Sequence, residues 1–142
     1  MSPKIILVTG ATDGIGMQTA RELAQQGHHV LVHGRNPERG ARIVAEISNR
    51  SGNSQVDWLC ADFSEMAQVR RLADEINSKY ERLDVLINNA GLLLPQRTLT
   101  PDGFETTFAV NHLAHFLLTN LLLEQIRASA PARIITVSSG VH

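Results

Sequence analysis

Residues 8–16 read VTGATDGIG and decide the fold of this chain. They follow a short apolar run, Ile5–Val8, and lead into a helical pattern. In such a strand-to-helix connection Gly10 permits a tight turn, Gly14 lets the backbone approach a diphosphate, and Gly16 lets the helix pack closely against the strand. The N–H groups and the positive dipole end of the helix then favour an anion. The stretch therefore predicts a dinucleotide-binding turn; the alternative is a glycine-rich turn without a ligand.

Outward from this turn, short apolar segments alternate with helical patterns, which is typical of βαβ units and a parallel sheet. We expect strands over residues 5–8, 30–32, 56–61, 85–87 and 133–137. We expect helices from about Ile15 to Gln26, from Pro37 with Asn36 as its cap, from a cap at Ser64, and from about Gly103 to Arg127. Right-handed crossovers then give an α/β, doubly wound Rossmann fold with the strand order 3-2-1-4-5.

Composition narrows the class of protein. The 142 residues suffice for one domain with a core. The net charge of −1 offers no basic surface for nucleic acid or for an anionic membrane. Cys60 is the only cysteine, so no internal disulfide can form, which fits a reducing compartment. Because no apolar run is long enough for a membrane span or a signal-peptide core, we expect a soluble, cytoplasmic protein that binds no nucleic acid.

Two motifs resemble the signatures of the short-chain dehydrogenase/reductase family: Thr9-Gly10-x-x-x-Gly14-Ile15-Gly16 and Asn88-Asn89-Ala90-Gly91. Residues 110–118, VNHLAHFLL, resemble the branch that includes retinol dehydrogenases and WW-domain oxidoreductases. The resemblance spans the whole chain. It implies that residues 1–142 form an NADP(H)-binding Rossmann domain without the family's C-terminal strands and helices. It also implies cofactor contacts along the first turn, at Thr9, Gly10, Thr12, Asp13, Gly14, Ile15 and Gly16.

The segment after the second strand bears on which dinucleotide binds. An acid there would bond the ribose 2′-hydroxyl of NAD, whereas an arginine accommodates the 2′-phosphate of NADP. The resemblance puts that acid's position at Gly34, and Arg35 and Asn36 follow. A guanidinium suits a phosphate, so we predict NADP(H) over NAD(H), with Arg39 as a further contact. Against this, Asp13 stands where some NADP-dependent relatives carry a base, and Arg35 alone is also typical of a solvated surface.

Two further strand ends complete the expected cofactor site. The resemblance implies that Asp62 bonds the adenine amino group, with the Phe63 backbone beside it; Asp62 could equally cap the loop before Ser64. Residues Asn89, Ala90 and Gly91 end the fourth strand, where ligands of open α/β sheets bind. The alternative for the amides is that they satisfy loop backbone groups.

Hydride transfer to a carbonyl needs a group that stabilises the oxygen and one that delivers a proton. The resemblance implies four residues for this chemistry: Asn, Ser, Tyr and Lys. Asn111 matches the asparagine that ties a water-linked proton relay to the lysine, and Ser139 matches the serine that bonds the substrate oxygen. The sequence contains no Tyr-x-x-x-Lys pair, since its only tyrosine is Tyr80 and its only lysines are Lys4 and Lys79. We therefore expect an NAD(P)-dependent oxidoreductase of alcohols and carbonyls, with an apolar substrate, whose 142 residues alone turn over little or nothing. The alternative is a non-catalytic NADP(H)-binding or regulatory module.

The predicted helix over residues 103–127 is apolar on more than one face. One face should cover the sheet, and we expect the other to mediate homo-oligomerisation. His112 and His115 share a face of this helix. Because metal sites need three or four ligands and no nearby Cys, Asp or Glu completes one, we expect packing or hydrogen bonding here and no metal.

Overall fold

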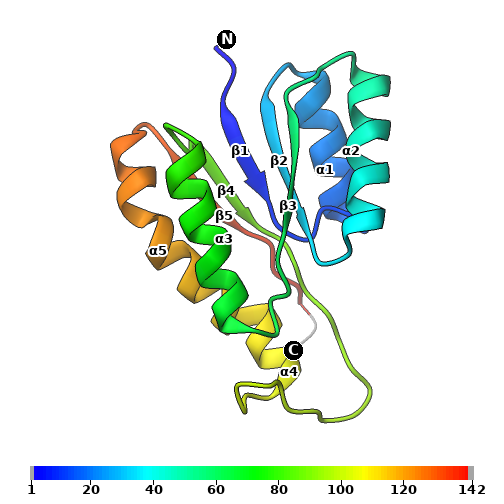
Figure 1. The fold of residues 1–142 in the computed structure, drawn as a ribbon, viewed down its shortest axis with the longest axis vertical. Helices are drawn as coiled ribbons and strands as arrows, with labels where there is room; N and C mark the ends of the chain where they lie inside the picture. Colours follow the sequence, from blue (N-terminus) through cyan, green and yellow to red (C-terminus); the bar gives the residue numbers. More distant parts are fainter. Residues whose placement is uncertain (1, 141–142) are drawn as a thin grey trace.

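The computed structural model describes residues 2–140 and has a parallel five-stranded sheet with helices on both faces (Figure 1). The strand order is β3-β2-β1-β4-β5, as predicted. The strands are β1 (Ile5–Val8), β2 (His29–Gly34), β3 (Val56–Cys60), β4 (Val85–Asn88) and β5 (Arg133–Thr136). The helices are α1 (Gly14–Gln25), α2 (Pro37–Ser51), α3 (Met66–Lys79), α4 (Thr106–Phe108), the π-helical turn η1 (Ala109–Leu113) and α5 (Ala114–Ala128).

The sheet separates two apolar layers. Alternate strand residues such as Leu7, Leu31 and Leu86 pack with α3 and α5, and their neighbours pack with α1 and α2. Both faces of the central strands are therefore covered, which explains why these strands are continuous apolar runs rather than alternating ones. Figure 1 shows α1 and α2 on one side of the sheet and α3 and α5 on the other.

The second helix begins as its sequence predicts. The Asn36 side chain accepts a hydrogen bond from the Arg39 N–H at 3.1 Å, and Pro37 occupies the first turn, where its missing N–H costs nothing. The first helix ends before Gly27, whose φ of +87° suits glycine in the left-handed region.

The predicted cap of the third helix is wrong. Ser64 does not cap it: the helix begins at Met66, after Glu65, whose side chain makes no capping hydrogen bond. The Ser64 N–H instead donates to Asp62 Oδ1 at 2.9 Å. Asp102, in the loop after β4, accepts from the Met66 N–H at 2.9 Å, so a distant carboxylate satisfies a donor that a local cap would have taken.

The predicted helix over residues 103–127 begins later and is not uniform. Gly103 has a φ of +86° and lies in a turn, and the Glu105 carboxylate caps the first turn by accepting from two backbone N–H groups. The helix then runs through η1 before α5 continues to Ala128. Within residues 2–140 no helix is long and apolar enough to cross a membrane.

Candidate cofactor-binding site

A cleft of about 470 Å³ lies at the carboxyl ends of β1 to β4. All the residues predicted to contact a cofactor line it, except Thr9 and Gly16, which lie buried beneath it. Those that line it are Gly10, Thr12, Asp13, Gly14, Ile15, Arg35, Asn36, Arg39, Asp62, Phe63, Asn89, Ala90 and Gly91. The fold thus brings together four loops that are far apart in the sequence, at the edge where open α/β sheets bind ligands.

The three glycines of the first turn each have a distinct environment. A Cβ on Gly10, whose φ is +61°, would lie 2.6 Å from Ala90 Cα, and one on Gly16 would lie 2.3 Å from the Gly10 carbonyl oxygen. These two positions therefore permit the tight turn and the close packing of α1. Gly14 has a φ of +55°, and a Cβ there would meet nothing within 4 Å. The backbone at Gly14 borders open space in the cleft, so the turn can receive a diphosphate.

Thr9 and Asn89 lock this turn to the end of β4. The Thr9 hydroxyl oxygen accepts from the N–H groups of Asn89 and Ala90, each at 2.9 Å. The Asn89 amide donates to the carbonyls of Thr9 and Gly10 at 3.0 and 3.1 Å. The amide at Asn89 thus does satisfy loop backbone groups, and the same bonds hold the floor of the cleft in place.

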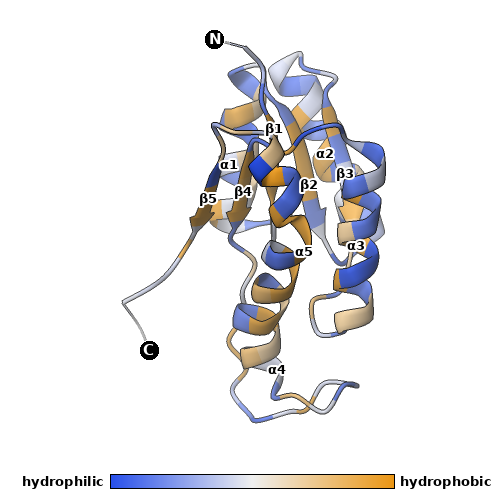
Figure 2. Cartoon of the chain, turned by 90° about the vertical axis from the view of Figure 1, so that its left-hand side faces the viewer, coloured by the Kyte–Doolittle hydropathy of each residue, from blue (hydrophilic) through white to orange (hydrophobic). Residues whose placement is uncertain are grey.

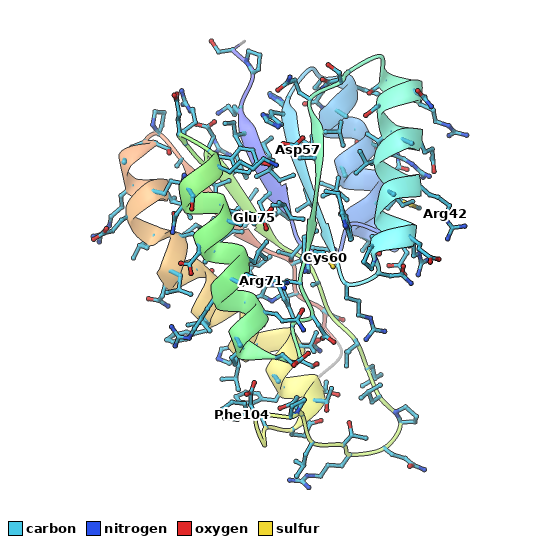
Figure 3. The ribbon with its side chains drawn as sticks, in the orientation of Figure 1. Arg42, Asp57, Cys60, Arg71, Glu75 and Phe104 are labelled. Atoms are coloured by element: carbon cyan, nitrogen blue, oxygen red, sulfur yellow. The ribbon has the colours of Figure 1, made fainter. Side chains whose placement is uncertain are left out.

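The end of β2 carries an arginine after Gly34, a glycine in crowded surroundings. A Cβ on Gly34 would lie 2.7 Å from Thr12 Cγ2 and 2.8 Å from the Trp58 ring. Arg35 is exposed at the rim of the cleft, while Arg39 pairs with Asp13 at 3.6 Å. The Asp13 carboxylate is therefore partly neutralised by its neighbour. Arg42, further along α2, points away from the cleft (Figure 3).

Asp62 and Phe63 occupy the end of β3. One carboxylate oxygen of Asp62 caps the following turn by accepting from the Ser64 N–H, the alternative that the sequence left open. The Phe63 ring is buried and stacks on His33 with ring centroids 4.2 Å apart.

His33 lines the cleft and was missed at the level of sequence. Its Nδ1 accepts from the Gly10 N–H at 3.0 Å, and its Nε2–H donates to the Ala61 carbonyl at 2.9 Å. Burial lowers the pKa of His33 to about 4, so the ring is neutral at pH 7 and keeps the lone pair that holds Gly10. The available signal was a polar residue at the end of an otherwise apolar run, just before Gly34.

The two residues predicted to be catalytic line a second cleft, of about 730 Å³, which shares Asn89, Ala90 and Gly91 with the first. Asn111 lies in η1, and its side-chain amide is engaged by the loop after β4: it donates to the Leu92 carbonyl and accepts from the Leu92 N–H, both at 2.8 Å. Ser139 follows β5 and is exposed. The structure therefore brings Asn111 and Ser139 to one cleft beside the cofactor turn.

The two helix histidines differ in their surroundings. His112 is exposed; its ring stacks on Phe108 with centroids 5.3 Å apart and lies tilted to Phe116 at 6.3 Å. His115 is buried, and its Nε2 lies 3.0 Å from the Thr9 hydroxyl. Within residues 2–140 no three His, Cys, Asp or Glu side chains form a group that could hold a metal ion.

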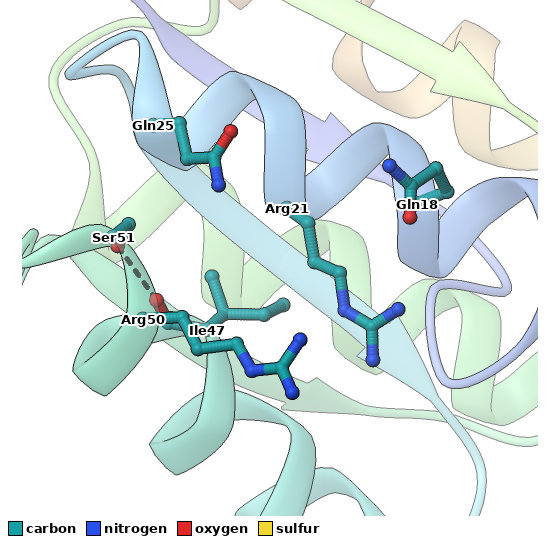
Figure 4. A pocket seen from close by; sticks show the side chains of 6 residues that line it. All are labelled: Gln18, Arg21, Gln25, Ile47, Arg50 and Ser51. Carbon is teal, nitrogen blue, oxygen red and sulfur yellow. Dashed lines mark hydrogen bonds between the residues drawn. The ribbon is translucent and has the colours of Figure 1, made fainter.

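A third and smaller cleft, of about 140 Å³, lies between α1 and α2 (Figure 4). Arg21 and Arg50 line it, and both approach the Glu46 carboxylate, Arg50 Nε at 3.9 Å. Because that carboxylate offsets their charge and the cleft lies away from the strand ends, we place the functional site in the first two clefts.

Comparison with known proteins shows the family and agrees with this fold. The family model for short chain dehydrogenases matches residues 4–142, so the chain belongs to that family. It is 46% identical to human retinol dehydrogenase 11 over 98% of this chain and 44% of that protein, and 41% identical to human polyprenol dehydrogenase over 98% and 43%. The chain therefore spans less than half the length of these relatives.

Solved structures of the family superpose closely. A short chain dehydrogenase from Escherichia coli CFT073, complexed with NADPH, matches with a TM-score of 0.85 and 34% identity over 99% of this chain and 60% of that one. Pseudomonas aeruginosa RhlG, in an active-site complex with NADP, matches with a TM-score of 0.82 and 33% identity over 98% and 56%.

Proposed function

We propose that this chain is the NADP(H)-binding part of an oxidoreductase that interconverts an alcohol and a carbonyl compound. The observation that carries the proposal is the cleft above Gly14, where a backbone free of any Cβ faces open space beside the start of α1. The description of two similar solved structures as NADP or NADPH complexes supports it.

Each wall of the cleft suits one part of the dinucleotide. The backbone from Gly10 to Ile15 would hold the diphosphate, and Asp62 with Phe63 would border the adenine. The loop from Asn89 to Gly91 opens toward the second cleft and would border the nicotinamide half. When bound, the cofactor supplies the hydride, and the chain supplies position and electrostatics.

The end of β2 favours NADP(H) over NAD(H). Gly34 supplies no carboxylate to bond a ribose 2′-hydroxyl, its surroundings are crowded by Thr12 and Trp58, and the exposed Arg35 is available to a 2′-phosphate. Asn36 stands beside it, and Arg39 both lines the cleft and offsets Asp13.

For the substrate we propose an apolar alcohol or carbonyl compound that enters the second cleft. The names of two relatives, a retinol and a polyprenol dehydrogenase, support this class. Ser139 would bond the substrate oxygen, and Asn111 would hold the loop at Leu92 that borders it. Because the 142 residues contain no Tyr-x-x-x-Lys pair, we expect them alone to bind cofactor without appreciable turnover. A non-catalytic NADP(H)-binding module is the second candidate, and carbonyl reduction by the whole protein would exclude it.

Calorimetric titration with NADPH and NADH tests the cofactor. We expect NADPH to bind more tightly, and Arg35→Ala to weaken NADPH roughly tenfold or more while leaving NADH nearly unchanged, because only NADPH carries the 2′-phosphate. Arg42→Ala, in the adjoining helix α2 and directed away from the cleft (Figure 3), is the matched control and should change the affinity for neither nucleotide. An equal loss of affinity for both nucleotides in Arg35→Ala would contradict the preference for NADP(H). If the parent chain bound neither nucleotide, the proposed function would be overturned.

A further inference from the structure

We infer that His115 is a positioning residue that joins the cofactor turn at Thr9 to Asn111 in the second cleft, through a single neutral tautomer of its ring. The inference rests on the proposed function and adds a residue to it. Its ring lies between the Thr9 hydroxyl, 3.0 Å from Nε2, and the Asn111 backbone carbonyl, 3.4 Å from Nδ1.

The hydroxyl of Thr9 determines the direction of the first bond. Its oxygen already accepts two N–H groups, those of Asn89 and Ala90, at 2.9 Å each. A hydroxyl oxygen has two acceptor lone pairs and one proton to give. A third donor would exceed that capacity, so the Thr9 O–H donates and His115 Nε2 accepts. The other acceptor near Thr9, the Ile87 carbonyl, is more distant at 3.4 Å.

The second contact, from Nδ1 to the Asn111 carbonyl, is longer at 3.4 Å and favours the same tautomer. The Asn111 carbonyl can only accept, so the proton of the neutral ring must be on Nδ1. One tautomer therefore satisfies both contacts, and the opposite tautomer satisfies neither. The chain of bonds runs from Asn89 and Ala90 through Thr9 and His115 to Asn111.

The surroundings keep the His115 ring in this state. It is 8% exposed and packs edge-on against Phe63, with ring centroids 5.3 Å apart. Burial lowers the pKa of His115 below its ordinary value; the Asn111 carbonyl opposes this shift, and the charge of His112 adds a smaller lowering. On other elements, His33 packs on the Phe63 ring that also contacts His115 and interacts electrostatically with His115, and Asp62 interacts with His33. Asp62 is the only acidic group among them.

Protonation would break the arrangement at one point. A charged ring carries a proton on Nε2 and cannot accept from Thr9, so the hydroxyl would face a third donor. The expected consequence is a looser turn and weaker nucleotide binding as the pH falls below the ordinary range of histidine. This consequence distinguishes a positioning role from simple filling of space.

The tautomer can be tested without any cofactor. Ring ¹⁵N and ¹³C chemical shifts of His115 at pH 7.5 should report the Nδ1–H form, with Nε2 unprotonated. The Nε2–H form, or a mixture of the two, would overturn the inference even if the chain bound no nucleotide. Failure of the proposed function and failure of this inference are therefore distinguishable.

NADPH titration from pH 8 to pH 5 tests the consequence. The glutamine in His115→Gln can accept from Thr9 and donate to Asn111 but does not titrate. Its Kd for NADPH at pH 7.5 should therefore lie within about threefold of the parent value. Its binding should not weaken at low pH as that of the parent does. His115→Phe fills the space with neither bond and should raise Kd roughly fivefold to tenfold at pH 7.5.

His28→Gln is the matched control. His28 is also buried and accepts a backbone N–H, that of Lys4 at 3.1 Å, but it lies at the opposite end of the sheet. The His28→Gln variant should keep the parent's Kd for NADPH and its dependence on pH. Parent-like affinity in His115→Phe, or an unaltered pH profile in His115→Gln, would overturn the positioning role.

Discussion

The carboxyl edge of β1 to β4 and the outer flank of α5 and β5 differ in how their side chains are satisfied. At the edge, polar groups from distant loops pair with one another, as Thr9 does with the loop after β4. Along the flank, apolar residues are exposed: Phe116 in α5 is 63% exposed, every residue of β5 is exposed, and Figure 2 shows hydrophobic residues along both elements. At the edge, these polar groups find their partners within residues 2–140, whereas the flank presents an apolar surface typical of a contact with another chain or segment.

The largest loss of stability is expected from a bulky side chain in the glycine turn at the carboxyl edge. Gly16→Val would place carbon atoms against the Gly10 carbonyl oxygen and the Asn89 amide nitrogen, which would lie only 2.3 and 2.4 Å from the new Cβ. Because one of these neighbours is backbone, we expect a loss of about 3 kcal/mol or more in the free energy of unfolding, measured by urea denaturation, and no NADPH binding. Gly140→Ala adds a methyl group to open space and is the control. A stable Gly16→Val variant that binds NADPH would show that the turn is not closely packed.

The second largest effect is expected from acid, which should lower the free energy of unfolding through His33 at the carboxyl edge. The pKa of His33 is about 4 in the folded chain and 6.5 when unfolded, so the unfolded chain binds the proton first. The stabilisation is full above pH 6.5 and is lost as the pH falls from 6.5 to 4, in total on the order of 3 kcal/mol. Chemical denaturation at several pH values measures this loss, and His33→Gln should flatten it. An equally steep profile in His33→Gln would assign the effect to other groups.

A smaller effect on stability is expected at the start of α2, on the rim of the first cleft. Asn36→Ala removes the side chain that accepts from the Arg39 N–H and should cost about 1 kcal/mol of unfolding free energy. Asn36→Asp keeps the acceptor and should restore the stability in the same thermal denaturation experiment. If Asp fails to rescue, the cap is not what stabilises this end of α2.

The smallest change in stability is expected on the flank. Phe116→Gln should alter the unfolding free energy by no more than about 0.5 kcal/mol, because the side chain is largely in solvent already. We propose that this flank mediates self-association, so the same variant should shift sedimentation velocity profiles toward the monomer. A parent chain that stays monomeric over a wide concentration range would count against that proposal.

The contrast also explains how far the sequence could be read. The tight turn at Gly10, the close packing at Gly16, the Asn36 cap and the strand order follow from local patterns and chain-order rules, and these are confirmed; that the turn binds a dinucleotide stays a prediction. The partners of His33 and His115 were not predictable in the same way. Gly10 lies 23 residues from His33, and Thr9 lies 106 residues from His115, so only the folded sheet brings each pair together. The wrong cap at Ser64 has the same cause, because a distant Asp102 replaces it.

The π-helical turn η1 has a consequence for the phase of the helix that follows. A π-turn contains one residue more than an α-helical turn, and one residue corresponds to a rotation of about 100°. That offset lets Asn111 meet Leu92 while Leu118, four residues after Ala114, still lies in the core. A regular α-helix of the same sequence would have to turn either the amide or the leucine out of place, so a single extra residue adjusts the helix to both the loop and the sheet.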